Sequence, residues 1–208
     1  KSVWSIGGRF GYEDQGETAN TQLAVYEYDE AILLFETRGL VGRHDIPRVV
    51  KNEYYTTEGK ITGGRFYPKN GGKAVGLDNF GGEVQPGGPF GNFVDCVRSR
   101  KRDHLNADVL EGHYSSALCH LGNISYRTGK PEAFDLKSKK FHNNPQVGEG
   151  VEALNDNLRG IGLDLKDVKY QVGKSLDFDP ETERFRDEGA NALLGRNYRK
   201  PFLVPEKV

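Results

Sequence analysis

The stretch that decides the fold is FGNFVDCVRSRKRDHLNADVLEGHYSSALCHLGNISY, residues 90–126. One face of the helical period carries four apolar side chains at spacings i, i+3, i+4 and i+7, namely Phe90, Phe93, Val94 and Val97. A helix is therefore predicted over residues 89–100. The basic residues at its end favour the negative pole of the helix dipole.

A second helix is predicted to begin at Asn106, a good N-cap, and to end near residues 128–131, where a glycine and a proline form a stop signal. Its apolar face is formed by Leu110, Tyr114, Ala117, Leu118, Leu121 and Ile124. Small residues on this helix would let another element approach closely; they are Gly112, Ser115, Ser116 and Gly122. The stretch therefore predicts a pair of amphipathic helices.

Residues before this helix pair are rich in β-strand patterns. Runs at 2–6, 22–28 and 31–38 predict three strands, and the two-residue break at Asp29-Glu30 predicts a hairpin. Apolar and polar residues do not alternate cleanly in the last two runs. Both strands are therefore predicted to be covered on both faces and to lie in the centre of their sheet.

Shorter patterns predict the remaining elements. Short strands are expected at 54–57, 60–62 and 65–67, followed by an irregular connector over 69–88. A third helix is expected over 147–158, a hairpin from 176–178 and 184–185, and a short helix over 188–194. An apolar, proline-limited tail over 198–205 is expected to pack across the domain.

Strands followed by helices, without the alternation of a parallel sheet, predict an α+β fold. The expected architecture is a predominantly antiparallel open sheet with helices packed on one face. A chain of 208 residues is long enough to bury one substantial core, so a single domain over residues 1–208 is predicted.

Composition argues against several kinds of partner. The 29 basic and 30 acidic residues nearly cancel, so no nucleic-acid partner is predicted. No apolar run reaches about 18 residues, so no membrane span is predicted.

The two cysteines, Cys96 and Cys119, are predicted to be reduced thiols in the core, with a disulfide between them as the open alternative. No metal site is predicted, because His113 and His120 stand seven residues apart on one helix, about 10 Å.

Several phrases resemble the C-terminal domain of the glucose–fructose oxidoreductase, inositol dehydrogenase and rhizopine catabolism (Gfo/Idh/MocA) family. They are GGRFGY at 7–12, GETANTQ at 16–22, FETRGL at 35–40, the helix pair at 90–126, FDPETERF at 178–185 and the close at 190–208. The resemblance implies an NAD(P)-dependent oxidoreductase that acts on a sugar, polyol or related carbohydrate. It also implies an N-terminal Rossmann domain that holds NAD or NADP. Residues 1–208 would then be the C-terminal domain that forms the substrate cleft wall and the oligomer interface.

The nucleotide and proton-transfer motifs of that family are not found in this sequence. No Gly-x-Gly-x-x-Gly follows a strand, and no Glu-Lys-Pro is present. No catalytic, cofactor-binding or metal residue is therefore predicted, and the chain alone is expected to be inactive and to bind no nicotinamide cofactor. Because the chain has no methionine and opens on a strand pattern, we expect a piece of a longer protein, with a processed mature protein as the alternative.

Candidate substrate-binding residues lie in the glycine-rich segment 9–22 and at the end of a strand. Arg9, Tyr12, Glu17 and Asn20 offer a cation, an aromatic face, a carboxylate and an amide, which are groups that bind sugar hydroxyls. Arg38 is predicted to anchor a substrate anion. The alternatives are an ordinary solvated loop and, for Arg38, an ion pair with Glu36 or another surface acid.

The predicted sheet also bears on assembly. Helices on one face leave the other face in need of cover, so residues 23–28 and 32–37 are predicted to face a second copy of the chain or another domain. A homo-oligomer is therefore expected. Two further functions stay open: a stand-alone non-catalytic carbohydrate-binding or assembly module, and part of an NAD-assisted glycosidase. The compartment also stays open, with the cytoplasm favoured over export.

Overall fold

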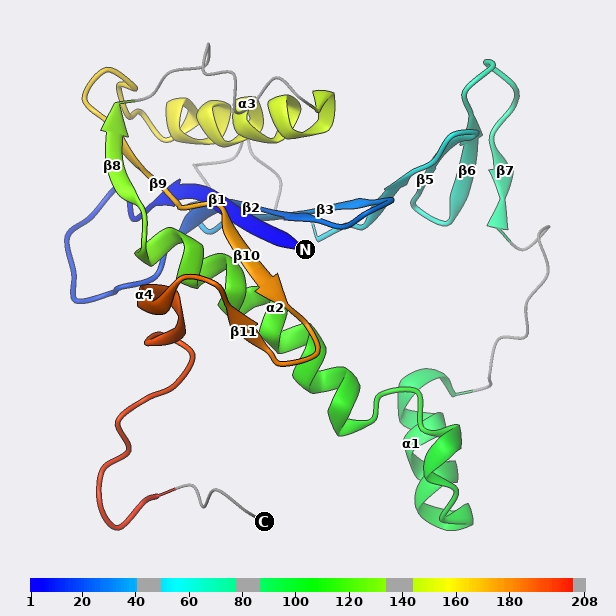
Figure 1. The fold of residues 1–208 in the computed structure, drawn as a ribbon. Coiled ribbons are helices and arrows are strands. Elements are labelled where there is room, and N and C mark those ends of the chain that lie inside the picture. Colours follow the sequence, from blue (N-terminus) through cyan, green and yellow to red (C-terminus); the bar gives the residue numbers. More distant parts are fainter. Residues whose placement is uncertain (41–49, 78–86, 134–143, 204–208) are drawn as a thin grey trace. The chain divides into compact units, whose positions relative to one another are not determined.

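The computed structural model describes residues 1–40, 50–77, 87–133 and 144–203 (Figure 1). The chain divides into two compact units, one of residues 1–47 with 115–208 and one of residues 48–114. They are called the first and second units below. That residues 1–208 form one C-terminal domain of a larger enzyme stays a prediction.

The first unit is built on a seven-stranded antiparallel sheet. Its main path runs β11-β10-β1-β2-β3, and β9, which also pairs with β1, carries β8. The strands are β1 (Ser2–Gly8), β2 (Thr21–Glu27), β3 (Ile32–Arg38), β8 (Lys130–Ala133), β9 (Lys169–Val172), β10 (Leu176–Asp179) and β11 (Arg184–Phe185). The predicted α+β class with an antiparallel sheet is confirmed.

The predicted hairpin at Asp29-Glu30 joins β2 to β3. The amide of Tyr28 donates to the carbonyl of Ala31 over 2.9 Å, and the two strands pair along their whole length. β2 is almost entirely buried, whereas β3 ends the strand order and is largely exposed. The prediction of a central strand covered on both faces is therefore right for β2 and wrong for β3.

Helices cover both faces of this sheet, which differs from the prediction of one covered face (Figure 1). Helix α3 (Pro145–Gly160) packs on the face that carries Leu23 and Val25. The second half of α2 (Val109–Arg127) and the short α4 (Glu188–Asn191) pack on the face that carries Ala24 and Tyr26. Consecutive apolar residues in β2 point to opposite faces, and each face requires its own cover.

This double cover also corrects the prediction about assembly. Residues 23–26 are at most 3% exposed in the single chain, so the centre of β2 needs no second copy to shield it. Among the described strands of this sheet, β3 is the one that retains an uncovered apolar side, and its partner stays a prediction.

Helix α3 follows directly from its sequence. The side chain of Asn144 caps it by accepting from the amides of Gln146 and Val147 over 2.9 and 3.3 Å, and a proline occupies the first turn. The predicted stripe is fully buried and consists of Val147, Val151, Leu154 and Leu158. Each such side chain contributes roughly 1.5–3 kcal/mol of transfer free energy.

The end of the chain follows the prediction only in part. The β10–β11 hairpin is confirmed, and Asp179 closes its turn by accepting from the amide of Glu181 and the hydroxyl of Thr182. The tail is predicted to pack across the domain, yet Tyr198 and Phe202 are both exposed. That prediction is wrong for residues 198–203, and residues 204 and 205 lie outside the described part.

The second unit contains a four-stranded antiparallel sheet in the order β4-β5-β6-β7. Its strands are β4 (Glu53–Tyr55), β5 (Gly59–Thr62), β6 (Arg65–Pro68) and β7 (Val75–Gly76). The predicted turn at Gly63-Gly64 is confirmed, and both glycines have the positive φ that a tight β-hairpin requires. β7 forms inside the segment predicted as an irregular connector.

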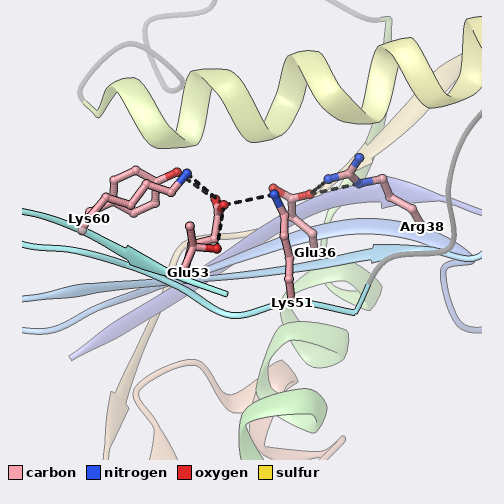
Figure 2. A network of polar contacts seen from close by, with 7 residues as sticks. Glu36, Arg38, Lys51, Glu53 and Lys60 are labelled. Carbon is pink, nitrogen blue, oxygen red and sulfur yellow. Dashed lines mark hydrogen bonds and ion pairs between the residues drawn. The ribbon is translucent and has the colours of Figure 1, made fainter. Parts of the chain in front are cut away.

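A carboxylate organises the start of this second sheet (Figure 2). Glu53 accepts from Lys60 at 2.8 Å, from Lys51 at 3.0 Å and from the Tyr55 hydroxyl at 2.9 Å. These partners, the Lys60 hydrogen bond first, lower the pKa of Glu53 to about 2. The negative charge of Glu53 is balanced by the ammonium groups of Lys51 and Lys60, which indicates a structural role for this cluster.

Helix α1 (Gly88–Ser99) of the second unit is where predicted, but its apolar face is not buried. Phe90 is 85% exposed, and the other three stripe residues are exposed as well. The buried residue of α1 is Asn92, whose amide donates to the carbonyl of His104 and accepts from the amide of Asn106. A short 3-10 helix, η2 (Arg102–His104), lies in this connection.

The N-terminus of α2 differs slightly from the prediction. The amide of Asn106 is used by Asn92, and Asp108 instead accepts from the amide of Leu110 over 3.0 Å. The helix therefore begins at Val109. Within the described residues, no helix combines the length and the apolar character needed to cross a membrane.

Candidate functional site

The loop between β1 and β2, which holds four of the predicted site residues, is organised around the guanidinium of Arg9. This group pairs with both carboxylate oxygens of Asp14, donates to the carbonyl of Thr18 over 3.2 Å and lies 5.3 Å from the ring centre of Tyr12. Asp14 also accepts from the amide of Gly16 over 2.8 Å. The hydrogen bonds from Arg9 and then Gly16 lower the pKa of Asp14 to about 2.

Two other loop residues have structural contacts. The Glu17 carboxylate lies 3.3 Å from Arg127, near the end of α2. The Asn20 amide accepts from the Phe10 N–H over 3.1 Å and donates to the Phe10 carbonyl over 3.0 Å. Asn20 therefore has both ends of its amide engaged by the backbone.

Arg38 pairs with a different residue and does not join the cluster around Arg9. It pairs with Glu36, donating from Nε over 3.0 Å, and Figure 2 shows the two side chains directed toward each other. Both belong to the β3 positions that alternate with Phe35 and Thr37, and so lie on the α3 face of the sheet. The structure thus brings Arg9 and Tyr12 together and leaves Arg38 apart from them.

A groove of about 230 Å³ lies between α2 and the β2–β3 hairpin. Strand residues form its floor, α2 forms one wall, and the β1–β2 loop contributes Thr18. It is lined by Thr18, Gln22, Ala24, Tyr26, Phe35, Thr37, Cys119, His120, Gly122 and Asn123.

Strand register explains the floor of the groove. Gln22 pairs with Thr37, and Ala24 pairs with Phe35, so all four side chains point to the α2 face. Because α2 covers β1 and β2 but not β3, Phe35 remains 48% exposed. Its ring is therefore open to a ligand.

The α2 wall of the groove is fixed by a close approach between this helix and the sheet of the first unit. A Cβ atom at Gly122 would lie 2.8 Å from the Tyr26 hydroxyl oxygen and 2.9 Å from Cβ of Ala24, so only glycine fits without a shift. The carbonyl of Gly122 accepts from the Ser5 hydroxyl over 2.9 Å and from the Gln22 amide over 3.1 Å. These contacts hold α2 at one position on the sheet.

The polar groups of the groove are hydrogen-bond donors and acceptors. Tyr26 donates to the carbonyl of Leu118, and burial raises the pKa of its phenol far above the ordinary value. The side chains of Thr37, His120 and Asn123 have no hydrogen-bond partner within the part of the chain that the structure describes. Such groups are free to bind hydroxyls of a small polar molecule.

Cys119 also lines this groove and is exposed, and Cys96 is partly buried. Both thiols are free, as predicted, but the prediction that they are core residues is wrong for both. Across residues 1–40, 50–77, 87–133 and 144–203, no group of three or more His, Cys, Asp and Glu side chains is arranged to hold a metal ion.

Two glycine pairs, Gly7-Gly8 and Gly63-Gly64, do not form a pyrophosphate-binding turn. Gly7-Gly8 ends β1 and leads to another antiparallel strand, and Gly63-Gly64 joins β5 to β6. Neither pair connects a strand to the N-terminus of a helix, which is the arrangement that binds a pyrophosphate. No chemical step is therefore assigned to a nucleotide on these residues.

Sequence reasoning found the loop beside the groove but missed most of the groove itself. The segment 9–22 contains both Thr18 and Gln22, whereas Phe35, Thr37 and Asn123 were not among the candidates. Period-two alternation places Phe35 and Thr37 on one strand face, and that signal was present. Their meeting with α2 depends on how the helix crosses the sheet, which no local pattern encodes.

No model of a protein family matches the chain, and no similar protein is found among curated sequences or among solved structures. The resemblance to the Gfo/Idh/MocA family therefore stays a hypothesis based on the sequence phrases.

Proposed function

We propose that this chain is the substrate-binding part of an NAD(P)-dependent oxidoreductase that acts on a sugar, polyol or related carbohydrate. The observation that carries the proposal is the groove between α2 and the β2–β3 hairpin. Its lining combines an exposed aromatic ring with amide, hydroxyl and imidazole groups that the protein itself leaves available. Sugars present this same combination of an apolar ring face and a rim of hydroxyls.

The role of the chain in this proposal is to bind and orient the substrate. Asn123 on the α2 wall and Thr37 on the β3 floor would hold substrate hydroxyls from two sides. NAD or NADP would be bound by a separate Rossmann domain and would supply the hydride acceptor. The enzyme would act as a homo-oligomer.

The test uses the full-length protein with NAD or NADP and a panel of sugars and polyols. Reduced nicotinamide is followed by absorbance, and Asn123→Ala and Thr37→Ala are compared with wild type. Loss of a hydrogen bond to a bound hydroxyl costs about 1–3 kcal/mol, so kcat/KM should fall roughly 5- to 150-fold in each variant. Asn52→Ala and Thr57→Ala remove the same side chains from exposed positions in the second unit and should leave kcat/KM unchanged.

Two results would change the proposed function or the proposed site. Sugar binding that depends on Asn123 but is never followed by nicotinamide reduction favours a non-catalytic carbohydrate-binding module. Turnover that neither groove variant affects would show that the groove is not the substrate site.

A further inference from the structure

The charged residues predicted to bind substrate are each paired with an opposite charge. Arg9 is occupied by Asp14, Glu17 lies against Arg127, and Arg38 pairs with Glu36 on the opposite face of the sheet. Among the described residues that line the groove, none carries a carboxylate, ammonium or guanidinium group. A ligand carboxylate or phosphate would therefore lose part of its hydration there without gaining an ammonium or guanidinium partner, which is unfavourable.

The size of the groove limits the ligand as well. Its volume is about 230 Å³. Pockets that enclose drug-sized ligands measure roughly 300–1,000 Å³. The groove therefore suits one sugar ring and is too small to enclose a chain of sugars.

The aromatic ring of Phe35 supplies a flat apolar surface in this groove. It is 48% exposed, and it lies beside Gln22 and Thr37 on the same sheet face. One face of a sugar ring consists of C–H groups, and packing that face on an aromatic ring removes apolar surface from water. The hydroxyls on the ring edge then point toward the strand and the α2 wall.

We infer that the groove binds a single uncharged sugar or polyol ring, which stacks on Phe35 and is hydrogen-bonded by Asn123 and Thr37. Phe35 is then a substrate-binding residue, and the ion pairs of Arg9, Glu17 and Arg38 are structural. This inference rests on the proposed function and adds to it the charge and size of the substrate.

The experiment measures binding to the full-length protein by calorimetry and by ligand-observed NMR. The neutral probes are D-glucose, D-galactose, D-xylose and myo-inositol, and the charged probes are D-glucuronate and D-glucose 6-phosphate. Maltose tests size. We expect at least one neutral monomer to bind tenfold or more tightly than either charged probe and than maltose.

Variants test the stacking contact. Phe35→Leu keeps an apolar side chain at an exposed strand position, and it should weaken binding of the best neutral probe at least tenfold, whereas Phe35→Tyr should preserve binding. Leu33→Ala is the control, because Leu33 is exposed on the same face of β3 but does not line the groove. Circular dichroism confirms that each variant is folded.

The outcomes separate this inference from the proposed function. Preferred binding of a charged probe, with Asn123→Ala still weakening it, overturns the inference and leaves the proposed function standing. Unchanged neutral binding in Phe35→Leu overturns the stacking role. Absence of binding for every probe overturns both.

Discussion

At the scale of single residues, the side-chain amide of Asn20 replaces a missing piece of β-ladder. It donates to and accepts from the backbone of Phe10 across the loop, as a paired strand residue would. Its own backbone continues the pattern, since its N–H donates to Gly8 and its carbonyl accepts from Gly39. The loop that ends at the groove therefore has a fixed base.

Replacing Asn20 with alanine should lower the free energy of unfolding by about 1–2 kcal/mol, because two partly buried backbone groups lose their partners. Urea unfolding followed by circular dichroism measures the change. Asn52→Ala is the matched control and should change stability by less than about 0.5 kcal/mol, since Asn52 is exposed. Equal stability of both variants would show that the amide of Asn20 does not hold the loop.

The Arg9–Asp14 pair makes the same loop sensitive to acid. The folded pKa of Asp14, about 2, lies below its ordinary value of 3.8, so its contribution is complete above pH 4 and is lost as the pH falls through about 2. An NMR titration of the Asp14 carboxyl should give this low pKa in the wild-type chain and a value closer to 3.8 in Arg9→Gln. Identical titration curves in the two proteins would contradict the assignment of Arg9 as the main cause.

At the scale of elements, the distance between α2 and the sheet decides whether the groove exists. Gly122 permits the approach, and Ser5 and Gln22 then reach its carbonyl. Moving α2 outward would break these hydrogen bonds and separate Asn123 from the strand floor.

Gly122→Ala should therefore destabilise the protein by about 1–3 kcal/mol, because its Cβ would contact Cβ of Ala24 at 2.9 Å. Gly112→Ala is the matched control in the same helix: nothing lies within 4 Å of its Cβ position, and alanine should stabilise the helix by roughly 0.5–1 kcal/mol. Chemical unfolding of both variants gives the comparison. A stabilising Gly122→Ala would mean that α2 is free to move away from the sheet.

Elements with local signals were predictable. The cap and stripe of α3, the β2–β3 hairpin and the small residue at Gly122 all follow from short-range patterns that the structure confirms. The exposure of β3 and the groove were not predictable, because they depend on which strands α2 covers. The apolar stripe of α1 shows the limit clearly: its periodicity identified a helix, but periodicity does not determine whether the stripe is buried.

At the scale of the whole molecule, apolar burial is concentrated in the first unit. Both buried clusters consist of its residues, on the two faces of the central sheet. In the described part of the second unit, Asn92 is the one buried residue, and Tyr54 and Phe93 are among its exposed large side chains. The two units therefore differ in what stabilises them.

This difference predicts unequal protection from hydrogen exchange in the 208-residue chain. β2 and β5 are a matched pair, because each is hydrogen-bonded to a strand on both sides. They differ in burial, since β2 lies between two helices and β5 is only half-buried. Local opening costs less free energy where few apolar contacts must be broken, so the amides of β5 should exchange at least tenfold faster than those of β2. Mass spectrometry of deuterium uptake, resolved to peptides covering the two strands, measures the ratio of their exchange rates.

Leu154→Ala should destabilise the first unit by about 2–5 kcal/mol and speed exchange in β2 without changing exchange in β5. Equal protection of the two strands would mean that contacts beyond those described here cover the second sheet.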